Sequence, residues 1–161
     1  MTTQKELEKK LWSDLKSDRT IMLALADGQG GDAQPMTVIF EKDTPGPCWI
    51  FSSSDVDLVK QLGATPKPAT AQFVAKGHSL FATLRGQLQV HNDRAMIDRL
   101  WNSFIAAWYD GKDDPKLRLL RLDLEHAHVW LNENSLLAGV KMMLGSDPKK
   151  EYKDKTADLK L

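Results

Sequence analysis

The sequence has little cysteine, no net charge and no long apolar run. Cys48 is the single cysteine among 161 residues, so the chain cannot form an internal disulfide or a metal site built from several cysteines. The 22 basic and 22 acidic residues cancel, which argues against a protein that neutralises many nucleic-acid phosphates. The longest apolar runs, such as residues 21–26, fall far below the roughly 20 residues of a membrane-spanning helix. We therefore expect neither a nucleic-acid partner nor a membrane partner.

The amino-terminal ten residues are polar and lack the apolar centre of a signal peptide. Together with the single cysteine, which suits a reducing compartment, this favours a cytoplasmic protein. A chain of 161 residues with 42% hydrophobic and 27% charged residues fits one compact domain. We expect this domain to span residues 1–145 and to be followed by a mobile, lysine-rich tail at residues 146–161. Near-zero net charge also gives weak repulsion between copies, which favours self-association.

Hydrophobic periodicity predicts six strands and three helices. The first helix begins after Thr3, which forms a capping box with Glu6, and a short helix covers residues 56–62. Most strands are joined by turn sequences, so the pattern predicts an α+β, mainly β fold: a six-stranded antiparallel barrel with flanking helices. The expected strands are residues 20–26, 34–42, 48–52, 69–75, 80–91 and 117–131.

Two longer segments carry more detailed expectations. Residues 93–109 show the clearest helical pattern, an apolar stripe that includes Trp101 and Trp108, with Asn92 as the cap. In the last strand, the alternation of apolar and polar residues shifts phase near Leu119, which predicts a bulge at that point.

The sequence contains no generic catalytic or nucleotide-binding motif such as GxxxxGK[ST], GxSxG, HExxH or CxxC. His126 and His128 are spaced to face one side of a strand and are a candidate metal pair, but a structural role is favoured because no third ligand is suitably placed. The aspartates of the 110–115 loop lack the spacing of an EF-hand and are interpreted as a turn. Cys48 lies in an apolar strand and is interpreted as a buried small residue. No acid, base or nucleophile is therefore identified.

Several motifs in a fixed order are typical of a known family. They are Gln34-Pro35-Met36 on one expected strand, residues 49–52 on the next, a hairpin that ends in Gly86, and a tryptophan-bearing helix followed by DGKDDP. The chain resembles the pyridoxamine 5′-phosphate oxidase-like split-barrel flavoproteins, in particular their general stress protein branch. The resemblance covers most of residues 4–131. It implies a split barrel, a homodimer, and FMN bound at the interface between the two subunits.

The resemblance also implies which residues contact the flavin. The family's phosphate-gripping arginine corresponds to Gln34, its hydroxyl position to Ser52 followed by Ser53, and its basic positions to Asp57 and Leu58. The resemblance therefore implies that the shape of a flavin site is kept while its charge complement is changed. The other positions that it places near the flavin are Pro35, Met36, Thr37, Val38, Phe51, Phe81 and Trp130.

Two functions remain open at this point. One is an FMN-binding split barrel like the general stress proteins, an oxidoreductase of unknown substrate. The alternative is a degenerate member that has lost strong flavin binding and acts as a non-catalytic binding or interaction protein. Loss of two charge-assisted hydrogen bonds, each worth roughly 1.5–3 kcal/mol, weakens phosphate binding by about two to four powers of ten, unless cations such as Lys60 or Arg85 compensate. A nucleic-acid-binding barrel is disfavoured by the neutral charge.

Overall fold

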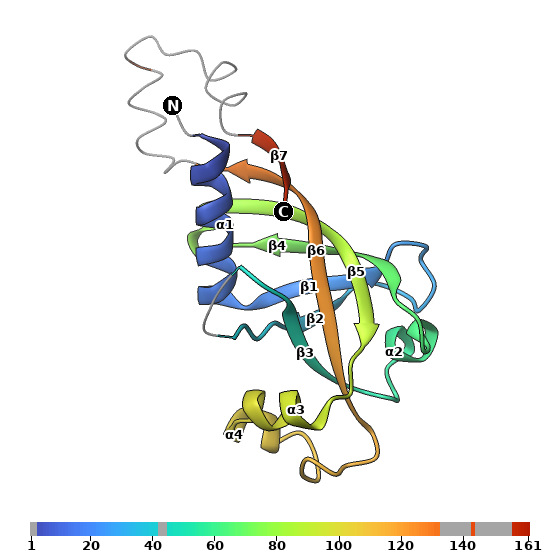
Figure 1. Cartoon of the computed structure of the whole chain (residues 1–161). Helices are drawn as coiled ribbons and strands as arrows, with labels where there is room; N and C mark the ends of the chain where they lie inside the picture. The colour runs from blue at the N-terminus through green and yellow to red at the C-terminus, as the bar shows by residue number, and fades with distance from the viewer. Residues whose placement is uncertain (1–2, 42–44, 133–142, 144–155) are drawn as a thin grey trace.

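The structure, a computed structural model, describes residues 3–41, 45–132, 143 and 156–161. In these residues seven antiparallel strands form one sheet, with α-helices and a 3₁₀ turn beside it (Figure 1). The predicted mainly β, α+β class is confirmed. The helices are α1 (Gln4–Asp18), α2 (Asp57–Leu62), α3 (Arg94–Leu100), α4 (Ser103–Ala106) and the 3₁₀ turn η1 (Lys76–His78); the strands are β1 (Thr20–Leu25), β2 (Gln34–Thr37), β3 (Cys48–Ser53), β4 (Lys67–Val74), β5 (Leu80–Val90), β6 (Leu117–Leu131) and β7 (Thr156–Lys160).

The sheet curls into a barrel that is open on one side. Its strands follow the order β2-β1-β4-β5-β6-β3, and β7 also pairs with β6. Beyond β2 the chain meets β3 at an isolated bridge between Ile39 and Trp49, whose two backbone hydrogen bonds measure 2.7 and 2.9 Å. Among the described residues β2 itself forms no ladder with β3. This opening gives the split barrel that the resemblance implies.

Alternate residues of each strand fill the barrel interior. On β5 the predicted alternation is confirmed, because every second residue from Leu80 to Leu88 is buried while the residues in between, from Phe81 to Gln87, are at least partly exposed. Helix α1 stands beside the sheet (Figure 1) and buries its apolar face in the same core. The helix begins with the predicted capping box of Thr3 and Glu6. No helix among the described residues is long and apolar enough to cross a membrane.

The predicted single helix over residues 93–109 is wrong, because the chain breaks after α3. Trp101 is extended, with φ −62° and ψ 135°, and Asn102 then caps α4 by accepting a hydrogen bond of 3.0 Å from the Ile105 amide. Asparagine is a strong helix cap, and here its local hydrogen bond competes with continuation of the helix. Asn92 does not cap α3; its side chain instead bonds to the Leu117 carbonyl and the Leu119 amide.

The bulge in the last strand is real but lies further along than predicted. The β5–β6 register shifts between Arg85 and Gly86, so that Glu125 is the extra residue on β6. The phase shift near Leu119 has another cause. Leu119 packs under α3 in a second apolar cluster, whereas Leu120 points into the barrel, so both are fully buried on opposite faces.

A seventh strand was not expected from the sequence. Strand β7 lies within the segment predicted as a mobile tail, and it pairs with β6 from His126↔Lys160 to Trp130↔Thr156. Leu159 of β7 is 3% exposed and joins the barrel core, which explains why a lysine-rich segment is ordered there. Most of the predicted tail lies outside the described residues.

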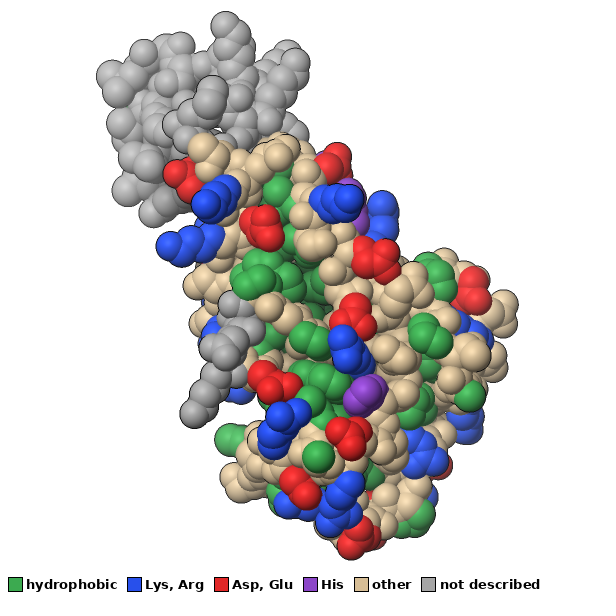
Figure 2. Space-filling model, viewed as in Figure 1, with side chains coloured by type: hydrophobic (Ala, Val, Ile, Leu, Met, Phe, Trp, Pro, Cys, Tyr) green, Lys and Arg blue, Asp and Glu red, His purple; other side chains and the backbone are tan. Residues whose placement is uncertain are grey.

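Charges of both signs are mixed over the face shown in Figure 2, where acidic and basic side chains alternate around small apolar areas. This arrangement agrees with the equal numbers of acidic and basic residues in the sequence. On that face no extended basic patch is present for a polyanion.

Candidate functional site

One row of side chains crosses the outer face of the sheet and contains several of the expected flavin contacts. Phe81 on β5 is the direct cross-strand partner of Trp130 on β6 and of Val74 on β4. Residues that lie directly opposite each other in an antiparallel pair point to the same face. Their neighbours Phe73 and Ala82 are buried, whereas Val74 is 49% exposed. The row therefore lies on the outside of the barrel.

The same row continues across β1 to β2. Thr20 pairs with Thr37, and the register that pairs Met22 with Gln72 continues to place Thr20 opposite Val74. Both threonines are exposed. The row from β2 to β5 spans three strand spacings, about 14 Å. A flat tricyclic ring system can lie across such a surface.

On its other side the row ends at the opening of the barrel. Thr37 on β2 and Phe51 on β3 each lie two residues from the Ile39–Trp49 bridge, on the two sides of this opening. Phe51 is half-buried, because Trp101 packs edge-on against it with ring centroids 6.0 Å apart. This contact explains why Trp101 leaves the helical pattern.

Aromatic neighbours also support the β5 and β6 end of the row. The ring of His78 stacks on Phe81 at 6.0 Å, and His128 lies 4.2 Å from Trp130. His78 has a φ of 57°, a left-handed conformation that non-glycine residues rarely adopt. We will call the residues of this line the outer row. It consists of Phe51, Thr37, Thr20, Val74, Phe81 and Trp130.

Four of the expected flavin contacts are buried in the barrel rather than exposed on its outer face. Met36, Val38, Ser52 and Leu58 are 9%, 0%, 6% and 1% exposed. Leu58, at a position where the resembled family carries a basic residue, is part of the core, and a Cβ on Gly30 would lie 3.0 Å from its Cα. These four residues can shape the surface from beneath, but Leu58 cannot reach a ligand outside the barrel.

The remaining expected contacts carry little positive charge. Gln34 is half-buried at the start of β2, and Pro35 is exposed on the same face as Thr37. Asp57 is exposed in the first turn of α2, so it places an acid where the resembled family has a base. Lys60, one turn further along α2, is exposed. These positions by themselves do not form a cationic site.

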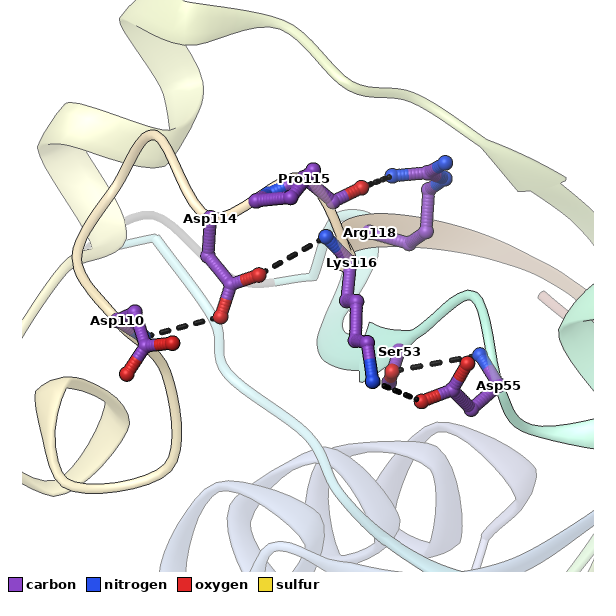
Figure 3. Close-up of polar contacts among 7 residues, drawn as sticks. All are labelled: Ser53, Asp55, Asp110, Asp114, Pro115, Lys116 and Arg118. Atoms are coloured by element: carbon purple, nitrogen blue, oxygen red, sulfur yellow. Dashed lines mark hydrogen bonds and ion pairs between the residues drawn. The ribbon is translucent and has the colours of Figure 1, made fainter.

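A cation does lie at the end of β3, where the chain meets the loop before β6 (Figure 3). The ammonium of Lys116 lies 2.9 Å from a carboxylate oxygen of Asp55, and the Asp55 amide donates a hydrogen bond of 3.3 Å to Ser53 Oγ. The Ser54 amide donates to the Lys116 carbonyl at 2.9 Å. The pairing with Asp55 raises the pKa of Lys116. Ser53 at the end of β3 and Ser54 directly after it are therefore held beside a lysine that stays charged.

The DGKDDP loop holds Lys116 in place. Asp114 accepts hydrogen bonds of 2.9 Å from the amides of Asp110 and Lys116, and these bonds hold the pKa of its carboxyl below the ordinary value (Figure 3). The carboxylate oxygens of Asp114 are thus used within the turn, which agrees with the interpretation of this loop as a turn.

Lys116 and Arg118 were not identified as site residues from the sequence. Arg118 is the cross-strand partner of Ser52, and its guanidinium donates to the carbonyls of Pro115 and Leu117, both at 2.8 Å. The signal available in the sequence was the position of both residues directly after DGKDDP. Their closeness to Ser52 depends on the pairing of β3 with β6, which the sequence pattern did not reveal.

The other candidate chemical groups have structural roles. Burial, and then the charge of Asp123, raises the pKa of the Cys48 thiol to about 12, so this cysteine is no nucleophile at neutral pH. His128 Nδ1 lies 2.6 Å and His126 Nε2 3.6 Å from the same carboxylate oxygen of Asp158 on β7. In the part of the chain that the structure describes, no group of three or more His, Cys, Asp or Glu side chains could hold a metal ion.

Comparison with known proteins agrees with this architecture. The family model described as pyridoxamine 5′-phosphate oxidase like matches residues 6–153 of the chain. The chain belongs to this family. Within this family the chain is similar to general stress proteins, and the similar structures include one that covers nearly the whole chain.

A general stress FMN/FAD-binding protein from Xanthomonas citri has a similar structure, with 51% sequence identity, a TM-score of 0.76, and coverage of 82% of this chain and 93% of that one. A structure assigned as general stress protein 26 from Jannaschia sp. CCS1 is 27% identical, with a TM-score of 0.77 and coverage of 98% and 100%. General stress protein 26 of Bacillus subtilis is 33% identical over 45 residues, which is 28% of this chain and 32% of that protein. The matched segment thus spans about a third of the length of the Bacillus subtilis protein.

Proposed function

We propose that this protein is a cytoplasmic homodimer that binds FMN on the outer row, with the opening between β2 and β3 at the phosphate end of the flavin. The observation that carries the proposal is the outer row itself. Four residues that the resemblance places near the flavin, Thr37, Phe51, Phe81 and Trp130, lie along it although they come from four different strands. The 51% identity to an FMN/FAD-binding protein from Xanthomonas citri supports the same ligand class.

The donor set at the end of β3 fits a phosphate monoester. Ser53 offers a hydroxyl, and Lys116 offers an ammonium 2.9 Å from Asp55 that can turn from this exposed carboxylate toward a ligand. Both side chains of that ion pair are 62% exposed, so the pair itself contributes little to stability. In this proposal Lys116 supplies the charge that is missing at Asp57 and Leu58.

A bound flavin supplies hydride or single-electron transfer, and the protein supplies the surface that orients it. Phe81 and Trp130 present apolar rings to the flat ring system, and Thr37 offers a hydroxyl at its edge. The two histidines beside the row are assigned supporting roles, because His78 stacks on Phe81 while His128 contacts Trp130 and is held by Asp158. The redox chemistry, with a substrate not yet identified, would therefore belong to the cofactor.

A second copy of the chain is proposed as the cover of this surface. Val74 on the outer row is 49% exposed and Met22 in the adjoining row 40% exposed. Phe104 on α4 and Trp108, two residues after this helix, are 82% and 84% exposed. Large exposed apolar side chains of this kind are typical of interfaces, where aromatic residues supply much of the binding energy. Light scattering during gel filtration should give a mass of two chains, and Val74→Lys should shift it toward one.

The flavin proposal is tested by spectroscopy. We expect the purified protein to carry a yellow chromophore, or the apoprotein to quench the fluorescence of added FMN in a saturable titration, with FAD and pyridoxal phosphate titrated alongside. A colourless protein that ignores FMN and FAD at high micromolar concentration would overturn the proposal.

The proposed role of Lys116 has its own test. Lys116→Gln should weaken FMN binding by about tenfold or more, because a charge-assisted hydrogen bond is worth roughly 1.5–3 kcal/mol. It should leave riboflavin binding unchanged, because riboflavin has no phosphate. Lys112→Gln, which removes a lysine paired with Asp98 in the same loop, is the matched control. Equal weakening of FMN and riboflavin would contradict a phosphate contact.

The degenerate-barrel alternative is favoured by one observation, the acid at Asp57 beside a buried Leu58. In this alternative the outer row is covered by the second copy and binds no flavin. A dimer that binds neither FMN nor FAD would support it. A dimer that binds flavin would exclude it.

A further inference from the structure

An open cavity of about 370 Å³, with mixed polar and apolar walls, lies on the outer face of the sheet beside the β5–β6 bulge. It is lined by the end of β1, the start of β4, and the bulged parts of β5 and β6, with Thr70, Arg85, Gln87, Glu125 and His126 as its polar residues. Cavities that bind small molecules have volumes of roughly 300–1,000 Å³. This cavity therefore has room for a small ligand.

The bulge builds the wall of this cavity. A Cβ on Gly86 would lie 2.0 Å from the Asp123 carbonyl oxygen and 2.9 Å from Leu124 Cα, so β5 and β6 touch backbone to backbone at this point. The close approach places Glu125 out of register as the extra residue. Bulges commonly redirect a side chain next to a functional site. Here the redirected groups are Glu125 and His126, which both line the cavity.

The polar side chains in the cavity are available for a ligand. Thr70 lies directly opposite Arg85, which lies opposite His126, so the three share the outer face. The side chains of Thr70, Arg85, Gln87 and Glu125 make no hydrogen bond or ion pair with any other described residue. The Nδ1 atom of His126 is shielded and has no partner within the described chain. The Arg85 guanidinium makes no hydrogen bond or ion pair with a described carboxylate, although its charge also acts on Asp158. Next to the Thr70 hydroxyl and the Gln87 amide, it is suited to an anionic group.

The charges around the cavity define the ligand further. Lys160 lies opposite His126 and adds positive charge on the Arg85 side, while Asp158 is already held by His128 and His126. Glu125 adds a carboxylate that can accept a hydrogen bond from a ligand. A ligand that suits the cavity carries an anionic group on the Arg85 side and a hydrogen-bond donor on the Glu125 side.

We propose that this cavity binds a small molecule whose carboxylate or phosphate is held by Arg85, Thr70 and Gln87, and whose ammonium or hydroxyl group donates to Glu125. Arg85 is four residues from Phe81 on the same face of β5, about 13 Å along the strand. If FMN is bound on the outer row, this small molecule lies beside it. The closeness of the two ligands rests on the proposed function, whereas the binding of the small molecule in the cavity does not.

The test uses the full-length apoprotein without flavin. The Arg85 Nε–H signal is followed by NMR while glycine, acetate and inorganic phosphate are added in turn, with sodium chloride at the same ionic strength as the reference. We expect saturable shifts with dissociation constants on the order of 1 mM. A stronger response to acetate identifies the carboxylate form of the ligand, and a stronger response to phosphate identifies the phosphorylated form. Shifts that match those from chloride alone for all three probes would overturn the proposal.

Variants separate this site from the flavin site. Arg85→Gln, in which the backbone amide signals of Thr70 and Gln87 replace the lost Arg85 signal as the readout, should weaken binding of the best probe about tenfold or more and leave FMN binding measured in the same preparation unchanged. Arg99→Gln, an equal change of charge on α3, should bind the probe as the unmodified protein does. Glu125→Gln should reduce the preference for glycine over acetate. Undiminished binding by Arg85→Gln would refute the site, whereas loss of flavin binding alone would refute only the function proposed above.

Discussion

Gly86 is the residue on which the geometry of the bulge depends. The structure allows no Cβ there, because a methyl group would lie 2.0 Å from the Asp123 carbonyl oxygen and 2.8 Å from the carbonyl carbon. These contacts are with backbone, which cannot swing aside as a flexible side chain can. Gly86→Ala must therefore push β6 away from β5 at the centre of the sheet.

The cost follows from two contributions. Overpacking in a tight interior costs about 1–3 kcal/mol, and each backbone hydrogen bond weakened between the strands costs about 1 kcal/mol. We expect Gly86→Ala to lower the free energy of unfolding by about 3 kcal/mol. For a chain of this length that corresponds to a fall in Tm of roughly 6–12 °C.

Urea unfolding followed by the fluorescence of the five tryptophans measures this change. Gly31→Ala is the matched control, because Gly31 has a φ of +85° but open space around the added Cβ. In the control the free energy of unfolding should fall only by the cost of an alanine in a left-handed conformation, about 1–2 kcal/mol. If Gly86→Ala were within about 0.5 kcal/mol of the unmodified protein, the close approach of β5 and β6 would be wrong.

Three further predictions concern other parts of the chain. Leu58→Lys should lower the free energy of unfolding by several kcal/mol, because it buries an ammonium where the leucine side chain is 1% exposed. As the control, Leu58→Met should lower it by less than about 1.5 kcal/mol in the same urea titration. Asn92→Ala should cost about 1–3 kcal/mol, because it leaves the Leu117 carbonyl and the Leu119 amide without their side-chain partner; no change in the urea midpoint would contradict that role. The hydrogen bond with His128, together with the charges of His128, His126 and Arg85, lowers the pKa of Asp158. The contribution of the Asp158 carboxylate to stability is therefore present at neutral pH. It is lost as the pH falls through the lowered pKa, below about 4. Asp158→Asn should therefore speed hydrogen exchange of the β7 amides at pH 7, and the difference from the unmodified protein should shrink as the pH falls through the lowered pKa; equal exchange at pH 7 would refute the contact.

Much of the fold could be predicted because it depends on local patterns. The alternation along β5 and the capping box of Thr3 and Glu6 are properties of short stretches, and both are present in the structure. The break at Asn102 could not be predicted from the apolar stripe alone. It depends on Trp101 packing against Phe51, which comes from a strand fifty residues earlier.

The candidate site divides in the same way. The resemblance implied Thr37, Phe51, Phe81 and Trp130 one by one, and four strand pairings together with the Ile39–Trp49 bridge bring them to one face of the barrel. The resemblance could not show that Leu58 is buried. It matches Leu58 to a position where the family carries a basic residue, and such a match does not say which way the leucine side chain points in this chain.

The sequence by itself determined the mainly β class, the strands that carry Thr37, Phe51, Phe81 and Trp130, and the absence of an internal disulfide, because residue period and cysteine count can be taken directly from the chain. Tertiary structure alone decided that Lys116 lies beside Ser53, that Glu125 is the bulged residue, and that part of the lysine-rich end becomes β7. Each of these depends on which strands pair and in which register. That choice is made by the burial of the whole barrel, which no short stretch of sequence encodes.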